Sequence, residues 1–251
     1  NYMKQYGLIG FPLSHSFSKR FFTEKFEQEN IRATYRNFEI KSISELPSVI
    51  GKNPELIGLN VTIPYKEQVI PCLNELDKAA AQIGAVNTIK ITRENSGFFL
   101  KGFNTDTYGF EQAIEPLLKS YHQKALILGT GGASKAIKFV LEKLGIGYIS
   151  ATTGKPQKNR IKYENIDKKM MAERLLIINA TPLGTYPQTD SSPAIPYEFI
   201  NKQHLLFDLV YNPEVTLFLK KGKARGAAIK NGYEMLEQQA LKSYEIWNEN
   251  E

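Results

Sequence analysis

Two charged residues, Lys66 and Asp106, stand where they could do chemistry. Each follows a segment with the pattern of a strand, and Pro64 ends the strand before Lys66. Side chains at strand ends can converge on one site, where an ammonium group can donate a proton and stabilise negative charge on a reacting oxygen. Each residue also has an ordinary explanation, because lysines are mostly solvated and an acid at the start of a helix commonly caps it.

A glycine turn, Gly129-Thr-Gly-Gly132, offers a second kind of chemistry. It follows the apolar run 125–128 and opens a segment of helical periodicity. Glycine lets the backbone approach a pyrophosphate closely, and the free N–H groups at a helix start attract its charge. Ser134 stands where the dinucleotide fingerprint has Gly or Ala, and glycine turns without a ligand are common. The spacing alone leaves both alternatives open.

The elements that must position these residues alternate between strand-like and helix-like segments. Asp77 is the expected N-cap of one helix, and Asn95-Ser-Gly97 is the expected turn of a hairpin. A strand, a glycine turn, a helix and a strand make a βαβ unit, which predicts an α/β fold with a parallel sheet. The predicted strands cover residues 6–9, 34–40, 56–63, 85–91, 98–103, 125–128, 148–151, 175–178, 205–210 and 227–229. The predicted helices cover residues 17–26, 66–76, 77–83, 105–121, 133–144 and 233–247.

Composition places the chain among ordinary globular proteins. Its 251 residues, 42% of them hydrophobic, suffice for one large domain or two smaller ones. No run of about 18 apolar residues is present and the first residues lack a signal-peptide pattern, so we expect a soluble, cytoplasmic protein. Cys72 is the only cysteine and cannot form an internal disulfide. The three histidines, His15, His122 and His204, show no ligand spacing, and we expect no metal site.

The chain has a net positive charge, and its basic residues are dispersed along the sequence. The formal net charge is +6, from 32 basic and 26 acidic residues. Most of the basic side chains are expected on solvated faces, and a positive field around a cleft would also attract a polyanionic substrate and cofactor. No clustered basic face with interleaved aromatic residues is evident, so we do not expect nucleic-acid binding.

Several motifs, taken together, resemble the shikimate dehydrogenase family. The resemblance covers nearly the whole chain, in the family's order. It implies a substrate domain of residues 1–104 plus a returning C-terminal helix at 231–251, and a Rossmann-like NADP-binding domain of residues 105–230. The motifs are the segments 9–18, Asn60-Val-Thr-Ile-Pro-Tyr-Lys66, Ala85-Val-Asn-Thr88, Gly102-Phe-Asn-Thr-Asp106, 128–134, Asn179-Ala-Thr-Pro-Leu-Gly184, Asp208-Leu-Val-Tyr211 and Met235-Leu-Glu-Gln-Gln239.

The resemblance implies an oxidoreductase of aromatic amino-acid biosynthesis that reversibly reduces 3-dehydroshikimate to shikimate with NADPH. Lys66 and Asp106 correspond to the catalytic pair, in which the carboxylate orients the lysine, binds a substrate hydroxyl, or does both. The implied substrate-binding residues are Ser16, Ser18, Asn60, Thr62, Asn87, Tyr211 and Gln239. The implied cofactor-binding residues are Gly129, Gly131, Gly132, Ala133, Thr152, Lys155 and Thr181.

Some of these assignments have competitors. Ser16 and Ser18 could instead cap the helix that follows them, and Gln238 competes with Gln239. The residues Asn60, Thr62 and Asn87 could serve only as hydrogen-bonding groups of turns and strand ends. Oligomeric state is open between monomer and homodimer.

The choice between NADP and NAD depends on residues 150–155. This stretch contains no Asp or Glu, which argues against NAD because an acid there would hold the ribose 2′-hydroxyl. Ala151 stands where the family usually has an arginine for NADP, and Lys155, Lys158 and Arg160 are the basic residues that could replace it. The alternative is a quinate/shikimate dehydrogenase with NAD or dual cofactor use. A non-catalytic NADP-binding protein is disfavoured because both Lys66 and Asp106 are present.

Overall fold

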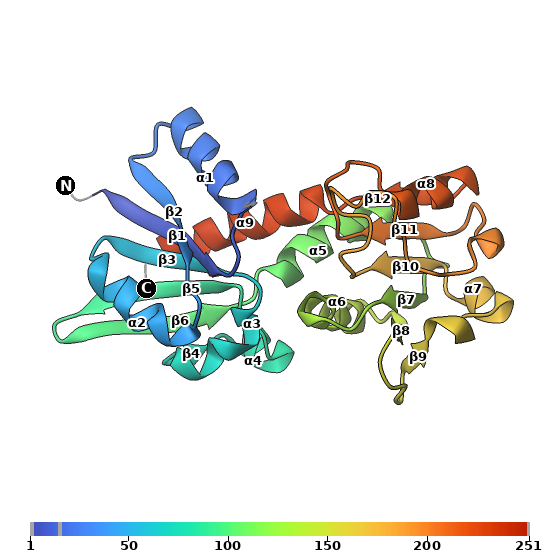
Figure 1. Ribbon diagram of the computed structural model, residues 1–251, viewed down its shortest axis with the longest axis horizontal. Coiled ribbons are helices and arrows are strands. Elements are labelled where there is room, and N and C mark those ends of the chain that lie inside the picture. Colours follow the sequence, from blue (N-terminus) through green and yellow to red (C-terminus); the bar gives the residue numbers. More distant parts are fainter. Residues whose placement is uncertain (1–2, 15–16, 250–251) are drawn as a thin grey trace. The chain divides into compact units, whose positions relative to one another are not determined.

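The computed structural model describes residues 3–14 and 17–249 of the chain (Figure 1), which divides into two compact units. Unit 1 consists of Asn1–Tyr108 and Gln239–Glu251, and unit 2 of Gly109–Gln238. The divisions fall inside two helices, α5 (Asp106–Ile114) and α9 (Tyr233–Asn248). The divisions expected from the sequence are after residues 104 and 230.

Unit 1 contains a mixed sheet of strand order β2-β1-β3-β5-β6-β4. Strands β1 (Lys4–Gly10), β2 (Ala33–Glu39) and β3 (Leu56–Val61) run parallel, so their carboxyl ends lie at one edge. Strands β5 (Thr88–Glu94) and β6 (Gly97–Phe103) form an antiparallel hairpin, which confirms the turn predicted at residues 95–97. The short strand β4 (Glu75–Leu76) pairs with β6.

Two apolar layers cover the two faces of this sheet. One contains α1 (Phe17–Gln28) and α9, whose Trp247 stacks on Tyr6 at 4.9 Å between ring centroids and donates from Nε1 to the Ile89 carbonyl oxygen at 3.0 Å. A Cβ on Gly58 would lie 2.5 Å from the Trp247 ring, so glycine is required where the helix crosses β3. The other layer contains the elements η1 (Ile43–Glu45), α2 (Leu46–Lys52), α3 (Tyr65–Gln68), η2 (Ile70–Cys72) and α4 (Lys78–Ile83).

Unit 2 is a six-stranded parallel sheet of order β12-β11-β10-β7-β8-β9, which confirms the predicted α/β architecture. Apolar cores lie on both faces, as expected for a parallel sheet covered by helices. Helices α5 and α6 (Gly132–Lys143) pack on one face, and α7 (Lys168–Glu173) and α8 (Leu217–Ala224) on the other. The strands are β7 (Lys124–Leu128), β8 (Gly147–Thr152), β9 (Arg160–Lys162), β10 (Leu176–Asn179), β11 (Leu205–Asp208) and β12 (Ala228–Lys230). Single turns of 3₁₀ helix are η3 (Glu115–Leu117), η4 (Tyr163–Asn165) and η5 (Tyr197–Phe199).

Two predicted helices are wrong in extent, both because of proline. The helix predicted at 66–76 ends at Gln68 and is followed by η2 and β4, since Pro71 has no N–H to continue the helical ladder. The helix predicted at 105–121 ends at Ile114, two residues before Pro116. Within residues 3–14 and 17–249, no helix has both the length and the apolar character needed to span a bilayer.

Candidate active site

Lys66 lies just beyond the carboxyl end of β3, on the one-turn helix α3. The Thr62 backbone N–H donates to the Ile9 carbonyl oxygen at 3.0 Å, so the chain leaving β3 stays beside β1. Tyr65 is buried, and its hydroxyl donates to the Ile40 carbonyl oxygen at 2.5 Å. The Lys66 carbonyl oxygen accepts from the Val86 N–H at 2.8 Å. These contacts fix the backbone of Lys66 from both sides while its side chain stays partly accessible.

Asp106 is the first residue of α5, and it pairs with Lys66. Lys66 Nζ lies 2.6 Å from Asp106 Oδ2, and the two side chains are 22% and 12% exposed. The Asp106 N–H donates to Asn104 Oδ1 at 3.1 Å, and Asn104 Nδ2 donates to the Ala85 carbonyl oxygen at 3.1 Å. The pair is therefore anchored at both ends and still reachable from solvent.

Asn87 holds the second oxygen of that carboxylate. Its Nδ2 donates to Asp106 Oδ1 at 3.1 Å and to Thr105 Oγ1 at 2.9 Å, while its Oδ1 accepts from the Thr105 N–H at 2.7 Å. The Asn87 side chain is 3% exposed. With one carboxylate oxygen on Lys66 and the other on Asn87, the orientation of Asp106 is defined by two separate strand ends.

A buried polar network continues from this pair to helix α9. Asn60 Nδ2 donates to Ser243 Oγ at 3.1 Å, and Ser243 Oγ lies 2.7 Å from Thr88 Oγ1 and 3.1 Å from Thr105 Oγ1. Gln239 Oε1 accepts from Asn87 Nδ2 at 3.4 Å and from Thr105 Oγ1 at 3.5 Å. The last helix therefore contributes two side chains, one turn apart, to the same network as Asp106. Gln238, the competing candidate, belongs to unit 2.

Ser18 approaches this network through Tyr35. The Tyr35 hydroxyl donates to Asn60 Oδ1 at 2.8 Å. Burial raises the pKa of Tyr35, and a hydrogen bond with Ser18 partly opposes that rise. Ser18, in the first turn of α1, is half-buried, as is Thr62. Ser16 lies outside the described residues.

The glycine turn of unit 2 has the geometry that a dinucleotide needs. Gly129 has φ +100°, and a Cβ there would lie 2.9 Å from Thr181 Cγ2, so a side chain is excluded. Gly131 and Gly132 are exposed, and a Cβ on either would meet nothing within 4 Å, so the space beside both glycines at the start of α6 is open. Its first N–H groups are available to an anion. Ala133, the second residue of α6, is half-buried.

The other predicted cofactor residues follow neighbouring strand ends. Thr152 is the last residue of β8 and is buried, with its Oγ1 accepting from the Gly154 N–H at 3.0 Å. Lys155 is exposed in the loop that follows. Thr181 follows β10 and donates from Oγ1 to Asn179 Oδ1 at 2.6 Å. Ala151, where the resemblance expects arginine, is fully buried against the apolar core that includes Leu126 and Leu128.

Tyr211, predicted to contact substrate, belongs to unit 2 and follows β11. It is half-buried, and its ring centroid lies 6.4 Å from that of Tyr233. The strand before it ends in Asp208, a fully buried acid that the sequence analysis did not assign to the site. Asp208 accepts from Thr216 Oγ1 at 2.6 Å and from Asn179 Nδ2 at 3.0 Å. This pairing ties the end of β11 to the end of β10.

Asp208 makes the stability of the protein depend on pH. Burial raises the pKa of Asp208 from 3.8 to about 6, although hydrogen bonds from Thr216, Val210 and Asn179 lower it. The folded protein therefore binds this proton more tightly than the unfolded chain, and its contribution to the free energy of unfolding falls as pH rises from about 4 to 6. Asp208→Asn should remove this fall, which is on the order of 3 kcal/mol. Denaturant unfolding of both proteins between pH 4 and 7, followed by circular dichroism, measures the difference; parallel stability curves would contradict it.

Four residues of the network were not singled out from the sequence: Tyr35, Thr88, Thr105 and Ser243. Thr88 and Thr105 stand inside motifs that were quoted, directly beside Asn87 and Asp106. Ser243 lies four residues after Gln239, on the same face of the helix. That spacing was an available signal for Ser243, whereas Tyr35 had none.

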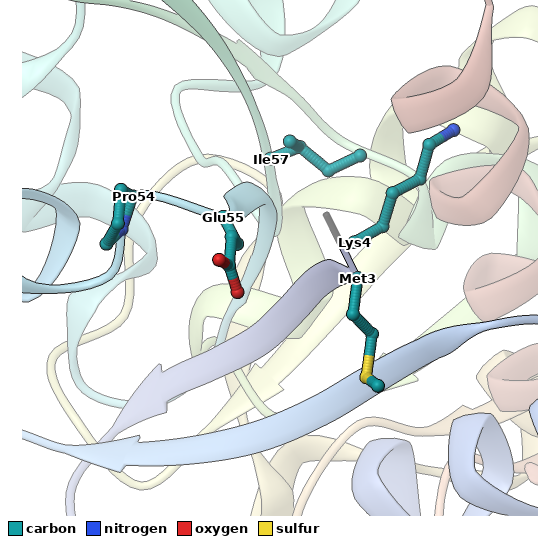
Figure 2. A pocket seen from close by; sticks show the side chains of 5 residues that line it. All are labelled: Met3, Lys4, Pro54, Glu55 and Ile57. Carbon is teal, nitrogen blue, oxygen red and sulfur yellow. The ribbon is translucent and has the colours of Figure 1, made fainter. Parts of the chain in front are cut away.

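A surface pocket lies at the other end of the unit 1 strands (Figure 2). It is lined by Met3, Lys4, Pro54, Glu55 and Ile57, around the amino ends of β1 and β3. Lys66 follows the carboxyl end of β3, so this pocket is separate from the network described above. Within the described part of the chain, no three His, Cys, Asp or Glu side chains group as metal ligands would.

Comparisons with known proteins point to one family. A family model described as the shikimate dehydrogenase substrate binding domain matches residues 8–89. Shikimate dehydrogenase (NADP(+)) of Desulforamulus reducens is 36% identical over 261 residues, covering 96% of this chain and 88% of the relative.

Solved structures agree with this similarity. Shikimate 5-dehydrogenase from Thermus thermophilus, in complex with NADP(H) and shikimate, has a TM-score of 0.83 and 28% identity over 98% of this chain and 94% of that one. Quinate dehydrogenase from Corynebacterium glutamicum, in complex with NAD, has a TM-score of 0.85 and 26% identity over 99% and 94%.

Proposed function

This chain belongs to the shikimate dehydrogenase family, and on that premise we propose that it catalyses the reversible, NADP-dependent reduction of 3-dehydroshikimate to shikimate. The observation that carries the proposal is the pairing of Lys66 Nζ with Asp106 Oδ2 at 2.6 Å, with Asn87 on the other carboxylate oxygen. The uncovered glycine turn of unit 2 supports the cofactor assignment.

The chemistry assigned to the pair is proton transfer. A bound NADPH would supply the hydride, and Lys66 would donate a proton to the carbonyl oxygen on which negative charge develops. The ammonium group also stabilises that charge before the proton moves. Asp106 keeps the lysine in place, because its own orientation is set by Asn87 and by the start of α5.

We assign substrate binding to the polar residues at the carboxyl edge of the unit 1 sheet, and on the family resemblance alone to Tyr211. The Asn87 amide already bonds to Thr105 and Asp106, which favours a second role in fixing those two residues. The Asn60 amide bonds to Ser243 and to the Asn87 carbonyl oxygen, which favours a second role in holding α9 and Asn87. Ser16 and Ser18 are assigned to the substrate carboxylate, since two hydroxyl donors suit one anion. The assigned residues are Ser16, Ser18, Asn60, Thr62, Asn87, Tyr211 and Gln239.

The cofactor assignment uses the uncovered start of α6 for the pyrophosphate. The absence of any acid from Ser150 to Lys155 favours NADP over NAD. A cytoplasmic location and a monomeric or homodimeric state stay predictions. The assigned residues are Gly129, Gly131, Gly132, Ala133, Thr152, Lys155 and Thr181.

A second candidate is a quinate/shikimate dehydrogenase with NAD or dual cofactor use. The observation that favours it is Ala151, a buried alanine where an arginine for NADP is expected. Initial rates with shikimate and with quinate, each against NADP and NAD, separate the two functions. The proposed function requires the highest kcat/KM with shikimate and NADP, and a higher kcat/KM with quinate or NAD would favour the second.

Ser18→Ala is expected to raise KM for shikimate by roughly 10 to 150-fold, because it removes one hydroxyl donor to a carboxylate, worth about 1.5 to 3 kcal/mol. The KM for NADP should stay nearly unchanged. Ser18→Thr keeps the hydroxyl and is the matched control. A parallel rise in both KM values would show instead that the start of α1 is damaged.

A further inference from the structure

The face of unit 2 that carries helix α6 collects positive charge beside strand β8. Tyr148 of β8 packs in the same core as the α6 residues Ile137 and Val140, and side chains along a strand alternate between faces. Ser150, two residues after Tyr148, therefore points toward α6. Arg160 is the register partner of Ser150 on the neighbouring strand β9, and it shares that face.

Lys138 lies one helical turn before Glu142, which accepts from the Tyr148 hydroxyl at 2.6 Å, so Lys138 is on the side of α6 that faces β8. Burial lowers the pKa of Lys138, and repulsion from Arg160 and Lys135 lowers it further, while Glu142 raises it. In the part of the chain that the structure describes, neither Lys138 nor Arg160 forms a salt bridge, and Glu142 already accepts from the Tyr148 hydroxyl at 2.6 Å.

The buried hydroxyl group on this face of β8 also lacks a hydrogen-bond partner. The Ser150 hydroxyl oxygen is buried, and among the described residues it has no hydrogen-bond partner. Buried hydroxyl groups are nearly always paired. An unpaired hydroxyl on the strand face that Ser150 shares with Arg160 is therefore a position where a bound anion, or a water molecule beside it, can supply the missing hydrogen bond. The sequence from Lys143 to Tyr163 contains no acid, so no further carboxylate of this segment competes for the cations.

The cluster is close to the cofactor turn. Lys138 is six residues after Gly132, roughly 9 Å along the helix axis. Side chains on a helix lean toward its amino end, which in α6 is the end that carries these glycines. Thr152, at the carboxyl end of β8, pairs in register with Lys162 of β9 on the same face.

We propose that Lys138 and Arg160 form the site for the 2′-phosphate of NADP in this chain, in place of an arginine at the end of β8. The inference rests on the proposed function and deepens it. Ala151 cannot supply the charge, because it is an alanine buried on the opposite face. Lys155 is an exposed loop residue, and its contribution is secondary.

Calorimetric binding of adenosine 2′,5′-bisphosphate, adenosine 3′,5′-bisphosphate and adenosine 5′-monophosphate tests the proposal without any turnover. The unmodified protein should bind the 2′,5′ compound most tightly. Lys138→Gln should weaken that binding by roughly 10 to 100-fold and leave the monophosphate within about twofold, because one charge-assisted contact to the 2′-phosphate is lost. Lys138→Arg should retain most of the affinity.

Lys169→Gln, which removes an exposed positive charge on α7, is the control and should change neither affinity. Lys155→Gln should weaken binding of the 2′,5′ compound less than Lys138→Gln does. The reverse order would overturn the proposal, as would equal binding of the 2′,5′ and 3′,5′ compounds, which would mark only a general positive field. Absence of shikimate oxidation would refute the proposed function. The calorimetric comparison of the three nucleotides would still test the phosphate site, because it does not depend on turnover.

Discussion

Lys66→Ala is expected to lower kcat by roughly 10² to 10⁴-fold, the usual range for loss of a general acid, with a smaller change in KM for shikimate. Without the ammonium group, the oxygen that receives negative charge has neither its proton donor nor its nearest cation. The variant should remain folded, because the backbone of Lys66 is held by its own hydrogen bond to Val86. Steady-state rates with shikimate and NADP measure the effect.

Lys101→Ala is the matched control. Lys101 also pairs with a carboxylate in unit 1, Glu75 Oε1 at 2.7 Å, but outside the network around Asp106. Its loss should change kcat by less than about twofold, because surface ion pairs contribute little. Near-normal kcat in Lys66→Ala, with the same fold by circular dichroism, would remove Lys66 from the mechanism.

Asp106→Asn should lower kcat by about 10 to 10³-fold if the carboxylate holds Lys66 for proton transfer. Asparagine keeps the shape and can still bond to Asn87, so the change isolates the loss of charge. Asp77→Asn is the control, since Asp77 also starts a helix of unit 1 and accepts from the Ala79 N–H, a capping role that asparagine can fill. An effect of Asp106→Asn on KM alone would identify Asp106 as a substrate-binding residue and not as a partner of the proton donor.

Local sequence patterns predicted most of the helices and strands, and features particular to this chain explain those that were not predicted. The run 125–128 and the hairpin turn at 95–97 were predictable because apolar periodicity and turn residues act over a few neighbours. Strand β9 was not predictable, because Arg160-Ile-Lys162 has one apolar residue and gains its strand form from pairing with β8. Only residues 153–159 connect these two parallel strands, whereas parallel neighbours usually need a crossover of about a dozen residues.

The site was predictable to the extent that its residues lie in recognisable motifs. The resemblance singled out Lys66, Asp106 and Asn87, and the structure brings their side chains together. The contacts of Ser243 with Asn60 and Thr88 could not be predicted from the sequence, because they join segments more than 150 residues apart. Helical periodicity predicts on which face of a helix such a residue lies, but not which residues of distant segments it contacts.

Helix α9 also determines when unit 1 can be completed during synthesis. Unit 1 needs both its first 108 residues and the stretch from Gln239, and the chain between them requires roughly 7 to 26 s of translation at ~5–20 residues per second. During that interval Tyr6 and Phe22 lack the Trp247 ring that covers them, and Asn60 and Thr88 lack Ser243. Unit 2 is contiguous and can fold first. A nascent chain can therefore acquire its glycine turn well before its Lys66 network is complete, with exposed aromatic rings that a chaperone would recognise in the meantime.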